Sequence, residues 1–228
     1  MKRVVITSSF AALLDEDKIS DPGTIFSEQS WNPVTMDQLG RSAVTPYRAS
    51  KTFAEKAAWE FVNDPANGVK FDLVTINPPM VFGPVAHHLS AGLGGINASN
   101  ERLVDLLAGK WKEKIPDVGP AMLWVDVRDV ARAHVKAGLE VEEAGGRRLF
   151  PTAGYFSNKE IVEIVRRRFP EYRERLPEEG REIGGGLPGE DERFRYDNGE
   201  TTRLLGIEWI GLEKSFGDAV RSLKKYGA

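Results

Sequence analysis

Residues 71–77 read Phe-Asp-Leu-Val-Thr-Ile-Asn, a short apolar and β-branched run that Pro78-Pro79 brings to a stop. A run of this length and composition is typical of a strand buried on both faces of a parallel sheet. Residues 3–8, Arg-Val-Val-Ile-Thr-Ser, have the same character. The two runs together predict two buried strands of one parallel sheet.

The segment between these two strands contains a helix pattern. Apolar residues recur at helical spacing over 45–62, and the turn residues of 64–68 end the pattern. Residues 15–46 are rich in Asp, Ser, Pro and Gly, and they predict a long surface loop anchored by Phe26 and Trp31. The order strand, loop, helix, strand is that of a parallel crossover unit.

The rest of the chain predicts mainly helices. Ser157 and Glu160 form a capping box at the start of a helix pattern. The charged and glycine-rich residues 173–198 predict an exposed loop. A further short strand is expected at 147–152, and helices are expected over 101–107, 124–139, 158–169, 198–205 and 212–226.

The composition is that of an ordinary globular chain. Its 228 residues are 41% hydrophobic and 29% charged, with a formal net charge of −3 and no cysteine. A chain without a basic field is not expected to bind nucleic acid or an anionic membrane surface. No apolar run reaches the ~18 residues of a transmembrane helix, and the lack of cysteine excludes disulfides and thiolate metal sites. We expect a cytoplasmic protein.

Tyr47-Arg48-Ala49-Ser50-Lys51 places a tyrosine and a lysine four residues apart in the predicted helix. Residues at this spacing lie one turn apart on the same helix face. An ammonium beside a phenol favours the phenolate and lowers the pKa of a tyrosine from its usual value of about 10. Such a phenol exchanges a proton with a carbonyl or alcohol oxygen. Taken alone the pattern is weak, because chance produces such a pair easily.

Two further groups of residues are expected beside this pair. Ser9 follows the first strand, and residues 78–84 (PPMVFGP) follow the second. The carboxyl ends of parallel strands line the crevice in which open α/β sheets bind ligands. Proline and glycine at that point let the backbone approach a planar ligand closely. Ser8 is an alternative to Ser9, because successive strand residues face opposite ways and the register decides between them.

In this order and spacing, these stretches resemble the extended short-chain dehydrogenase/reductases, the NAD-dependent epimerase/dehydratase family. The likeness is closest to the branch of dihydroflavonol reductases and NADPH-dependent aldehyde, ketone and methylglyoxal reductases. It spans residues 3 to about 152 continuously and the remainder more loosely. The stretches that support it are RVVITSS (3–9), QSWNP (29–33), YRASKTFAEKAAWEF (47–61), FDLVTINPPMVFGP (71–84), INAS (96–99) and WVDVRDVARAH (124–134).

The resemblance implies an α/β fold, here an incomplete Rossmann-like parallel sheet with a smaller, mainly helical substrate region. Residues 1–152 would form the remainder of the NAD(P)-binding domain, and residues 83–125 would also contribute to the substrate region. Residues 153–228 would form the C-terminal substrate region.

The resemblance also implies catalytic roles. Tyr47 would be the general acid, Ser9 would hydrogen-bond the substrate carbonyl, and Lys51 would lower the tyrosine pKa and hold the nicotinamide ribose. The implied reaction is NAD(P)H-dependent reduction of a small aldehyde or ketone to the alcohol, with NADP(H) favoured over NAD(H) through the branch. The alternative enzyme is a nucleotide-sugar epimerase or dehydratase, which shares the Ser, Tyr and Lys set.

Further residues would bind the cofactor and the substrate. By resemblance, Pro78 and Val81 would border the nicotinamide, with the Val81 backbone addressing its carboxamide. Ser99 would contact the phosphate side of the cofactor. Met80 and Phe82 would line the substrate pocket, with core packing as the alternative.

The remaining candidates have structural explanations. His87-His88 has no cysteine or carboxylate cluster beside it, so no metal site is expected. His134 lies on an apolar helix face and is interpreted as a core or interface histidine. Asp126 and Asp129 are interpreted as helix caps rather than catalytic groups.

One element of the family pattern is missing. The family's cofactor fold begins with a strand, a G-x-x-G-x-x-G turn and a helix whose N-terminus receives the pyrophosphate, and no such element precedes Ser9. The glycine match over 184–189 follows no predicted strand and contains Pro188, so we reject it. The strand at 3–8 is then expected to leave a hydrophobic sheet edge open to a protein partner or to self-association. A further hypothesis is that the chain is an inactive truncated remnant or an interaction module.

Overall fold

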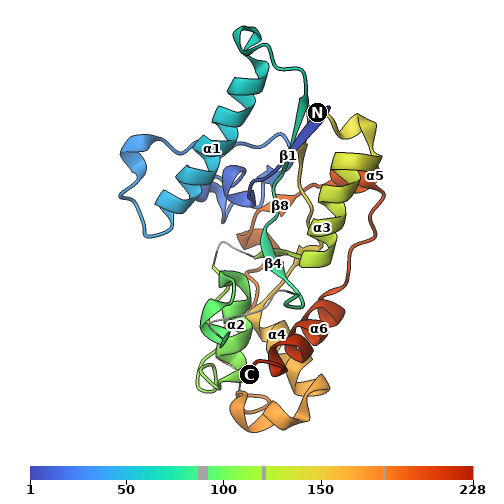
Figure 1. Ribbon diagram of the computed structural model, residues 1–228. Helices are drawn as coiled ribbons and strands as arrows, with labels where there is room; N and C mark the ends of the chain where they lie inside the picture. The colour runs from blue at the N-terminus through green and yellow to red at the C-terminus, as the bar shows by residue number, and fades with distance from the viewer. Residues whose placement is uncertain (87–91, 120–121, 182, 228) are drawn as a thin grey trace. The chain divides into compact units, whose positions relative to one another are not determined.

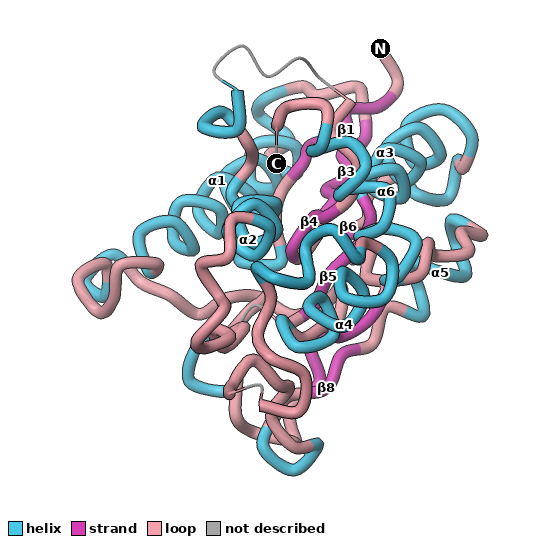
Figure 2. Tube along the Cα trace, turned by 90° about the horizontal axis from the view of Figure 1, so that it is seen from below, coloured by secondary structure: helices cyan, strands magenta, loops and turns pink. Residues whose placement is uncertain are grey.

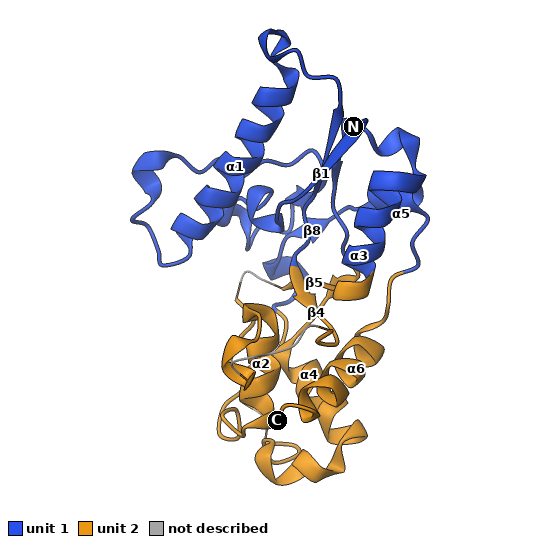
Figure 3. Cartoon of the chain, viewed as in Figure 1, with its two compact units in different colours: residues 1–79, 129–152, 188–208 blue, residues 80–128, 153–187, 209–228 orange. Residues whose placement is uncertain are grey.

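The fold was analysed in a computed structural model that describes residues 1–86, 92–119, 122–181 and 183–227. The chain divides into two units, each made of three segments (Figure 3). Unit 1 contains residues 1–79, 129–152 and 188–208, and unit 2 contains residues 80–128, 153–187 and 209–228. Within the described ranges, no helix is long and apolar enough to cross a membrane.

Unit 1 is built on the predicted parallel sheet. Strands β1 (Arg3–Thr7), β3 (Asp72–Ile76) and β6 (Arg148–Leu149) pair in the order β1-β3-β6. Both pairings are parallel, and Val5 of β1 lies opposite Val74 of β3. The three predicted strands and the α/β class are confirmed.

Helices cover both faces of this sheet. Helix α1 (Thr45–Asn63) lies on one side and helix α3 (Val127–Val135), together with the π-helical turn Lys136–Glu140, on the other (Figures 1 and 2). The bounds predicted for α1 are confirmed within a residue. Arg3 fastens the π-helical turn to the strands, because its guanidinium donates to the Asp72 carboxylate and to the carbonyl oxygens of Ala137 and Val141.

The helix predicted over 124–139 begins too early. Leu123–Asp126 is strand β5, and the helix starts only at Val127. Within this helix and the π-helical turn that follows it, Val130, Ala133 and Ala137 are buried, whereas Ala131 is exposed. The apolar residues at 123–125 are buried because they form a strand, and their spacing only coincides with the helical pattern that follows.

Residues 188–208 were predicted to belong to the C-terminal region, but they return to unit 1. Strand β8 (Arg195–Tyr196) pairs in parallel with β2 (Ile25–Phe26). Phe194 is fully buried, and its ring meets Phe26 at 4.9 Å and Phe10 at 5.9 Å between centroids. The charged segment 173–198, which was predicted as an exposed loop, therefore contains a fully buried aromatic residue, Phe194. Residues 188–208 cluster with residues on the other side of the predicted boundary at 152.

Unit 2 joins a second small sheet to helices. Strand β4 (Met80–Phe82) pairs in parallel with β5, which pairs in antiparallel fashion with β7 (Gly154–Tyr155). The Phe82 ring is fully buried, 5.0 Å from that of Phe156 and 4.7 Å from that of Phe216. The helices of this unit are α2 (Ala98–Leu107), α4 (Asn158–Arg168) with its predicted capping box, and α6 (Leu212–Lys224).

The other elements are short. Helix α5 (Gly199–Leu205) belongs to unit 1 and agrees with the predicted helix at 198–205. Short 3-10 helices lie at Phe10–Ala12 (η1), Glu16–Lys18, Met36–Gln38, Pro65–Asn67, Gly92–Gly95, Glu142–Ala144, Pro170–Arg175 and Glu190–Glu192.

The aromatic cluster of unit 2 gives a stability prediction. Phe82→Ala should lower the free energy of unfolding by about 3–5 kcal/mol, because it removes a fully buried ring and leaves a cavity. The matched control is Phe61→Ala, since the Phe61 ring is 54% exposed and its loss should change stability by less than about 0.5 kcal/mol. Urea denaturation of both variants measures the difference, and equal losses would contradict the assignment of Phe82 to the core.

Candidate active site

The predicted site residues fall into both units, so each group is described within its own unit. Ser9, Tyr47, Lys51 and Pro78 belong to unit 1. The remaining four, Met80, Val81, Phe82 and Ser99, belong to unit 2.

Ser9 and Pro78 lie together at the carboxyl ends of β1 and β3. Ser9 is the N-cap of η1, and its Oγ accepts the Ala11 backbone N–H at 3.1 Å. The Phe10 N–H donates to the Pro78 carbonyl oxygen at 2.9 Å, which ties the two strand ends to each other. Because its oxygen is an acceptor in the cap, the Ser9 hydroxyl hydrogen is left to donate elsewhere.

Tyr47 and Lys51 lie in the first two turns of α1, the helix that packs against η1. Pro46 favours the helix start, where its missing N–H costs nothing. The Tyr47 side chain is 57% exposed and Lys51 is half-buried. Across the described part of the chain, neither side chain makes a hydrogen bond or an ion pair. In unit 1, the serine hydroxyl of Ser9 at η1 and the side chains of Tyr47 and Lys51 on α1 therefore lie on two elements that contact each other.

Ser8 and Ser9 have different environments, as expected for successive residues at a strand end. Ser8 is buried, and its hydroxyl donates to Glu55 Oε2 at 2.5 Å. Ser9 is only partly buried. The Ser8 hydroxyl is therefore committed to a neighbour within the fold, whereas that of Ser9 is not.

Glu55 is a site residue that the sequence analysis missed. Its carboxylate is completely buried and accepts hydrogen bonds from Ser8, Asn77, Thr75 and Arg148. Burial opposes ionisation, but the hydrogen bonds and the Arg148 charge outweigh it and hold the pKa of Glu55 below its usual value. The sequence indicates the burial of Glu55 only by its position on the face of α1 that also carries the buried residues Arg48 and Thr52.

In unit 2, the two predicted cofactor-binding groups contact each other. The Val81 backbone N–H donates to Ser99 Oγ in the first turn of α2 at 3.3 Å. Met80 is half-buried, and Phe82 lies in the core, which was the alternative to a place in the substrate pocket. The structure therefore brings Val81 and Ser99 together and gives Phe82 a packing role.

A buried carboxylate supports the end of β4. The Asp126 carboxylate at the end of β5 accepts the Arg128 backbone N–H and its guanidinium, each at 2.8 Å. Gly83 has φ 127°, and a Cβ there would lie 3.1 Å from Asp126 Oδ2. Burial opposes ionisation of Asp126, but the hydrogen bonds from Arg128 hold its pKa below the usual value. The interpretation of Asp126 as a cap of α3 is confirmed.

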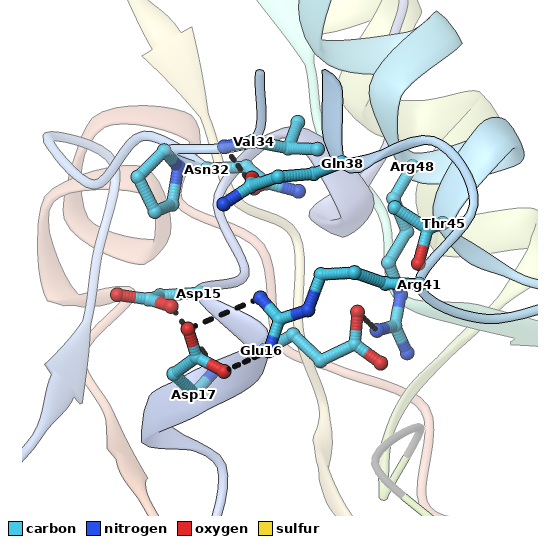
Figure 4. A pocket seen from close by; sticks show the side chains of 10 residues that line it. Asp15, Glu16, Asp17, Asn32, Val34, Gln38, Arg41, Thr45 and Arg48 are labelled. Carbon is cyan, nitrogen blue, oxygen red and sulfur yellow. Dashed lines mark hydrogen bonds and ion pairs between the residues drawn. The ribbon is translucent and has the colours of Figure 1, made fainter. Parts of the chain in front are cut away.

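A pocket in unit 1 lies beside the start of α1 and contains none of the predicted site residues (Figure 4). Its volume is about 240 Å³. Two ion pairs cross it, Arg48 to Glu16 at 2.9 Å and Arg41 to Asp17 at 2.6 Å. Four of the five charged residues that line this cavity are therefore paired across it, and the fifth, Asp15, lies 3.9 Å from Lys18.

The other candidates have structural roles where the structure describes them. His134 Nε2 lies 2.7 Å from Thr7 Oγ1 and its Nδ1 lies 2.8 Å from the Val130 carbonyl oxygen, so both ring nitrogens are engaged. In the described ranges, no group of three His, Asp or Glu side chains is arranged to hold a metal ion. The pair His87-His88 lies outside the described residues.

Comparisons with known proteins add a consistent set of relatives. No protein-family model matches the chain. It is similar to the ketoreductase azaE of Aspergillus niger, with 42% identity over 98% of this chain and 62% of the relative. It is also similar to the NADPH-dependent methylglyoxal reductase GRE2 of Saccharomyces cerevisiae, with 34% identity over 99% of this chain and 64% of the relative.

Solved structures agree with these relatives. The structure of Gre2 in complex with NADPH from Candida albicans matches with a TM-score of 0.81 and 34% identity, over 100% of this chain and 65% of that one. The α/β fold with a Rossmann-like parallel sheet is thus shown, and proteins named as NADPH-dependent reductases are among those to which the chain is similar. The chain spans less than two thirds of the length of these relatives.

The low pKa of Asp126 makes its contribution to stability pH-dependent. A carboxyl with a folded pKa below the unfolded value of 3.8 stabilises the fold fully above that value, and the contribution is lost as the pH falls through the folded pKa. Asp126→Asn should therefore be less stable than the wild type at pH 7, and the gap should narrow at pH 3. Asp105→Asn, which alters the exposed pair with Lys110, should show a small gap at both values. Urea denaturation at the two pH values measures both, and a gap for Asp126→Asn that widens in acid would contradict the assignment.

Proposed function

We propose that this chain carries the catalytic residues of an NADPH-dependent carbonyl reductase that reduces a small aldehyde or ketone to the alcohol. The observation that supports it best is the arrangement in unit 1. Ser9 caps η1, and η1 packs against the helix that presents Tyr47 and Lys51 with no partner among the described residues. The names of the relatives, ketoreductase and methylglyoxal reductase, favour a reductase over a nucleotide-sugar epimerase or dehydratase.

Each residue has a chemical role in this proposal. The Tyr47 hydroxyl gives its proton to the substrate oxygen, and the Ser9 hydroxyl donates a hydrogen bond to the same oxygen. Lys51 lies one helical turn from Tyr47, where its ammonium stabilises negative charge on the phenol oxygen. Ser9 is preferred to Ser8, because Ser8 is buried and bonded to Glu55.

The residues present fit the nicotinamide end of the cofactor. When bound, NADPH supplies the hydride that reduces the carbonyl carbon. Lys51 and Tyr47 would hold the nicotinamide ribose, since neither is engaged elsewhere in the described chain. Pro78, in the same unit, would border the nicotinamide. NADP(H) is preferred to NAD(H) because two of the matching structures are complexes of Gre2 with NADPH.

A second candidate function, an interaction module, is favoured by the free edge of β1. The Asp72 N–H donates to the Lys2 carbonyl oxygen and the Ser8 N–H donates to that of Ile76. Even-numbered residues of β1 therefore face β3, and the backbone groups of residues 3, 5 and 7 point the other way. Within the described ranges β1 pairs with β3 alone, and its side chains are partly exposed where those of β3 are buried. We propose this edge as the place where a protein partner or a second copy adds a strand.

The role of Tyr47 gives a direct test. Tyr47→Phe should reduce kcat/KM for NADPH-dependent reduction of methylglyoxal by at least ~100-fold, because it removes the proton donor and keeps the ring. Tyr226→Phe at the end of unit 2 is the matched control and should keep the wild-type rate. Initial rates followed by NADPH absorbance measure both. A Tyr47→Phe variant as active as the control would refute the role of Tyr47.

Cofactor binding separates the reductase from the interaction module. If the chain retains a sufficient cofactor site, calorimetric titration should give a Kd for NADPH below about 10 μM, which corresponds to roughly 7 kcal/mol. Lys51→Met should weaken this binding, whereas Lys70→Met in an exposed loop should not. No heat at millimolar NADPH, together with a dimer in light scattering, would favour the module.

A further inference from the structure

The carboxylate of Glu55 is buried and connects helix α1 to the ends of strands β1 and β3, the elements that carry the proposed site. Glu55 lies on α1, one turn after Lys51 and two turns after Tyr47. None of its side chain is exposed. A buried carboxylate is costly unless hydrogen bonds and an opposite charge compensate it, so its partners show what it holds.

One carboxylate oxygen binds the two strand ends of the proposed site. Glu55 Oε2 accepts the Ser8 hydroxyl at 2.5 Å and the Asn77 side-chain amide at 2.6 Å. These are the residues that directly precede Ser9 and Pro78. The same Asn77 Nδ2 also donates to the Ser9 carbonyl oxygen at 3.3 Å. A single amide therefore links Glu55 to the backbone of the proposed catalytic serine.

The other oxygen binds the centre of the sheet and the loop that precedes α1. Glu55 Oε1 accepts the Thr75 hydroxyl at 2.9 Å and Arg148 Nε at 2.6 Å. The Arg148 guanidinium stacks 3.7 Å from the centre of the Trp31 ring, and its Nη1 donates to the carbonyl oxygens of Glu28 and Ser30. The segment between Ser9 and Tyr47 is thus fixed to the same carboxylate.

A glutamine could not replace this carboxylate without loss. All of these partners donate to Glu55, as does the Trp59 indole N–H, at 3.4 Å from Oε1. A carboxylate has only acceptor oxygens, whereas an amide has one oxygen and an NH₂ group that donates. The Ser8 and Thr75 hydroxyls could turn to accept from that NH₂ group, but the Asn77 amide and the Arg148 guanidinium could not, so one of these two would face another donor. The charge of Arg148 would also lose its counterion.

We propose that Glu55 is a positioning residue, which holds Ser9 at the distance from Tyr47 and Lys51 that the reaction needs. The inference rests on the proposed function, and it assigns to Glu55 no contact with substrate or cofactor. Two residues connect Glu55 to Ser9, and both bind the Glu55 carboxylate. Ser8 directly precedes Ser9 in the chain, and the Asn77 amide donates to the Ser9 carbonyl oxygen.

The test is Glu55→Gln, with Glu60→Gln as its matched control. Glu60 lies on the same helix but is exposed, so the control makes the same chemical change without the buried partners. For methylglyoxal reduction, Glu55→Gln should lower kcat about 10- to 100-fold and change the KM for NADPH by less than about threefold, because the nicotinamide contacts assigned to Lys51 remain. Glu60→Gln should leave both unchanged.

A double-mutant cycle separates positioning from a general loss of structure. Ser9→Ala should reduce kcat strongly in the wild type and in Glu60→Gln, but by less than about threefold in Glu55→Gln, because a displaced hydroxyl has little left to lose. Uniform destabilisation would leave the cost of Ser9→Ala unchanged. A full cost of Ser9→Ala in the Glu55→Gln background would overturn the proposal.

Hydrogen exchange supplies a measurement that does not depend on activity. In Glu55→Gln, exchange should accelerate in residues 8–12 more than at the β2–β8 pair of the same unit. If the wild type itself shows no turnover, the proposed function fails. Independently of turnover, equal hydrogen exchange at residues 8–12 in Glu55→Gln and Glu60→Gln would overturn the anchoring role of Glu55. Should Glu55→Gln not fold, Ser8→Ala keeps the Glu55–Arg148 pair, and it should still accelerate exchange at 8–12 and lower kcat about three- to tenfold. A Ser8→Ala variant with wild-type exchange and kcat would overturn the proposal.

Discussion

The buried ion pair between Glu55 and Arg148 is the interaction on which the arrangement of unit 1 depends. It joins α1 to β6 across the end of β3, and both side chains are almost completely withdrawn from water. Removing one member of such a pair costs about 3–5 kcal/mol, because the other is left as an uncompensated buried charge. The sheet, the helix with the proposed catalytic tyrosine and the loop at 28–31 are therefore held by the same two residues.

The parts of the fold that were predictable are the ones encoded locally. The strands at 3–8 and 71–77 were confirmed because each is a β-branched run that the residues directly after it bring to an end. Helix α1 was confirmed because the helical spacing of its apolar residues stops where the turn residues 64–68 begin. The strand at 123–126 was missed, since its apolar residues run directly into the periodic pattern of α3. Phe194 was missed for a different reason: a single aromatic residue in a charged stretch has no local signal of burial, and its partners Phe10 and Phe26 lie far away in sequence.

The same distinction applies to the candidate site. Ser9, Tyr47 and Lys51 could be proposed from the sequence because strand ends and helical spacing determine where their side chains lie, and the structure brings their elements into contact within one unit. Glu55 was not found, because its importance depends on Ser8, Asn77 and Arg148, which reach it only when three strands and a helix have assembled. Local patterns identify groups that can react, and the residues that hold them in place emerge only from tertiary contacts.

The alternation of a β-strand explains how one site can need both serines at the end of β1. Successive residues face opposite sides, so Ser8 points inward to the carboxylate beneath α1 while Ser9 remains partly exposed and caps η1. A shift of one residue in the β1–β3 register would exchange these environments and place Ser9 against Glu55. The pairing of Val5 with Val74 and the Arg3–Asp72 pair both oppose that shift. Which serine faces Glu55 and which one caps η1 as the proposed reactive serine is therefore fixed by contacts along β1 away from its carboxyl end.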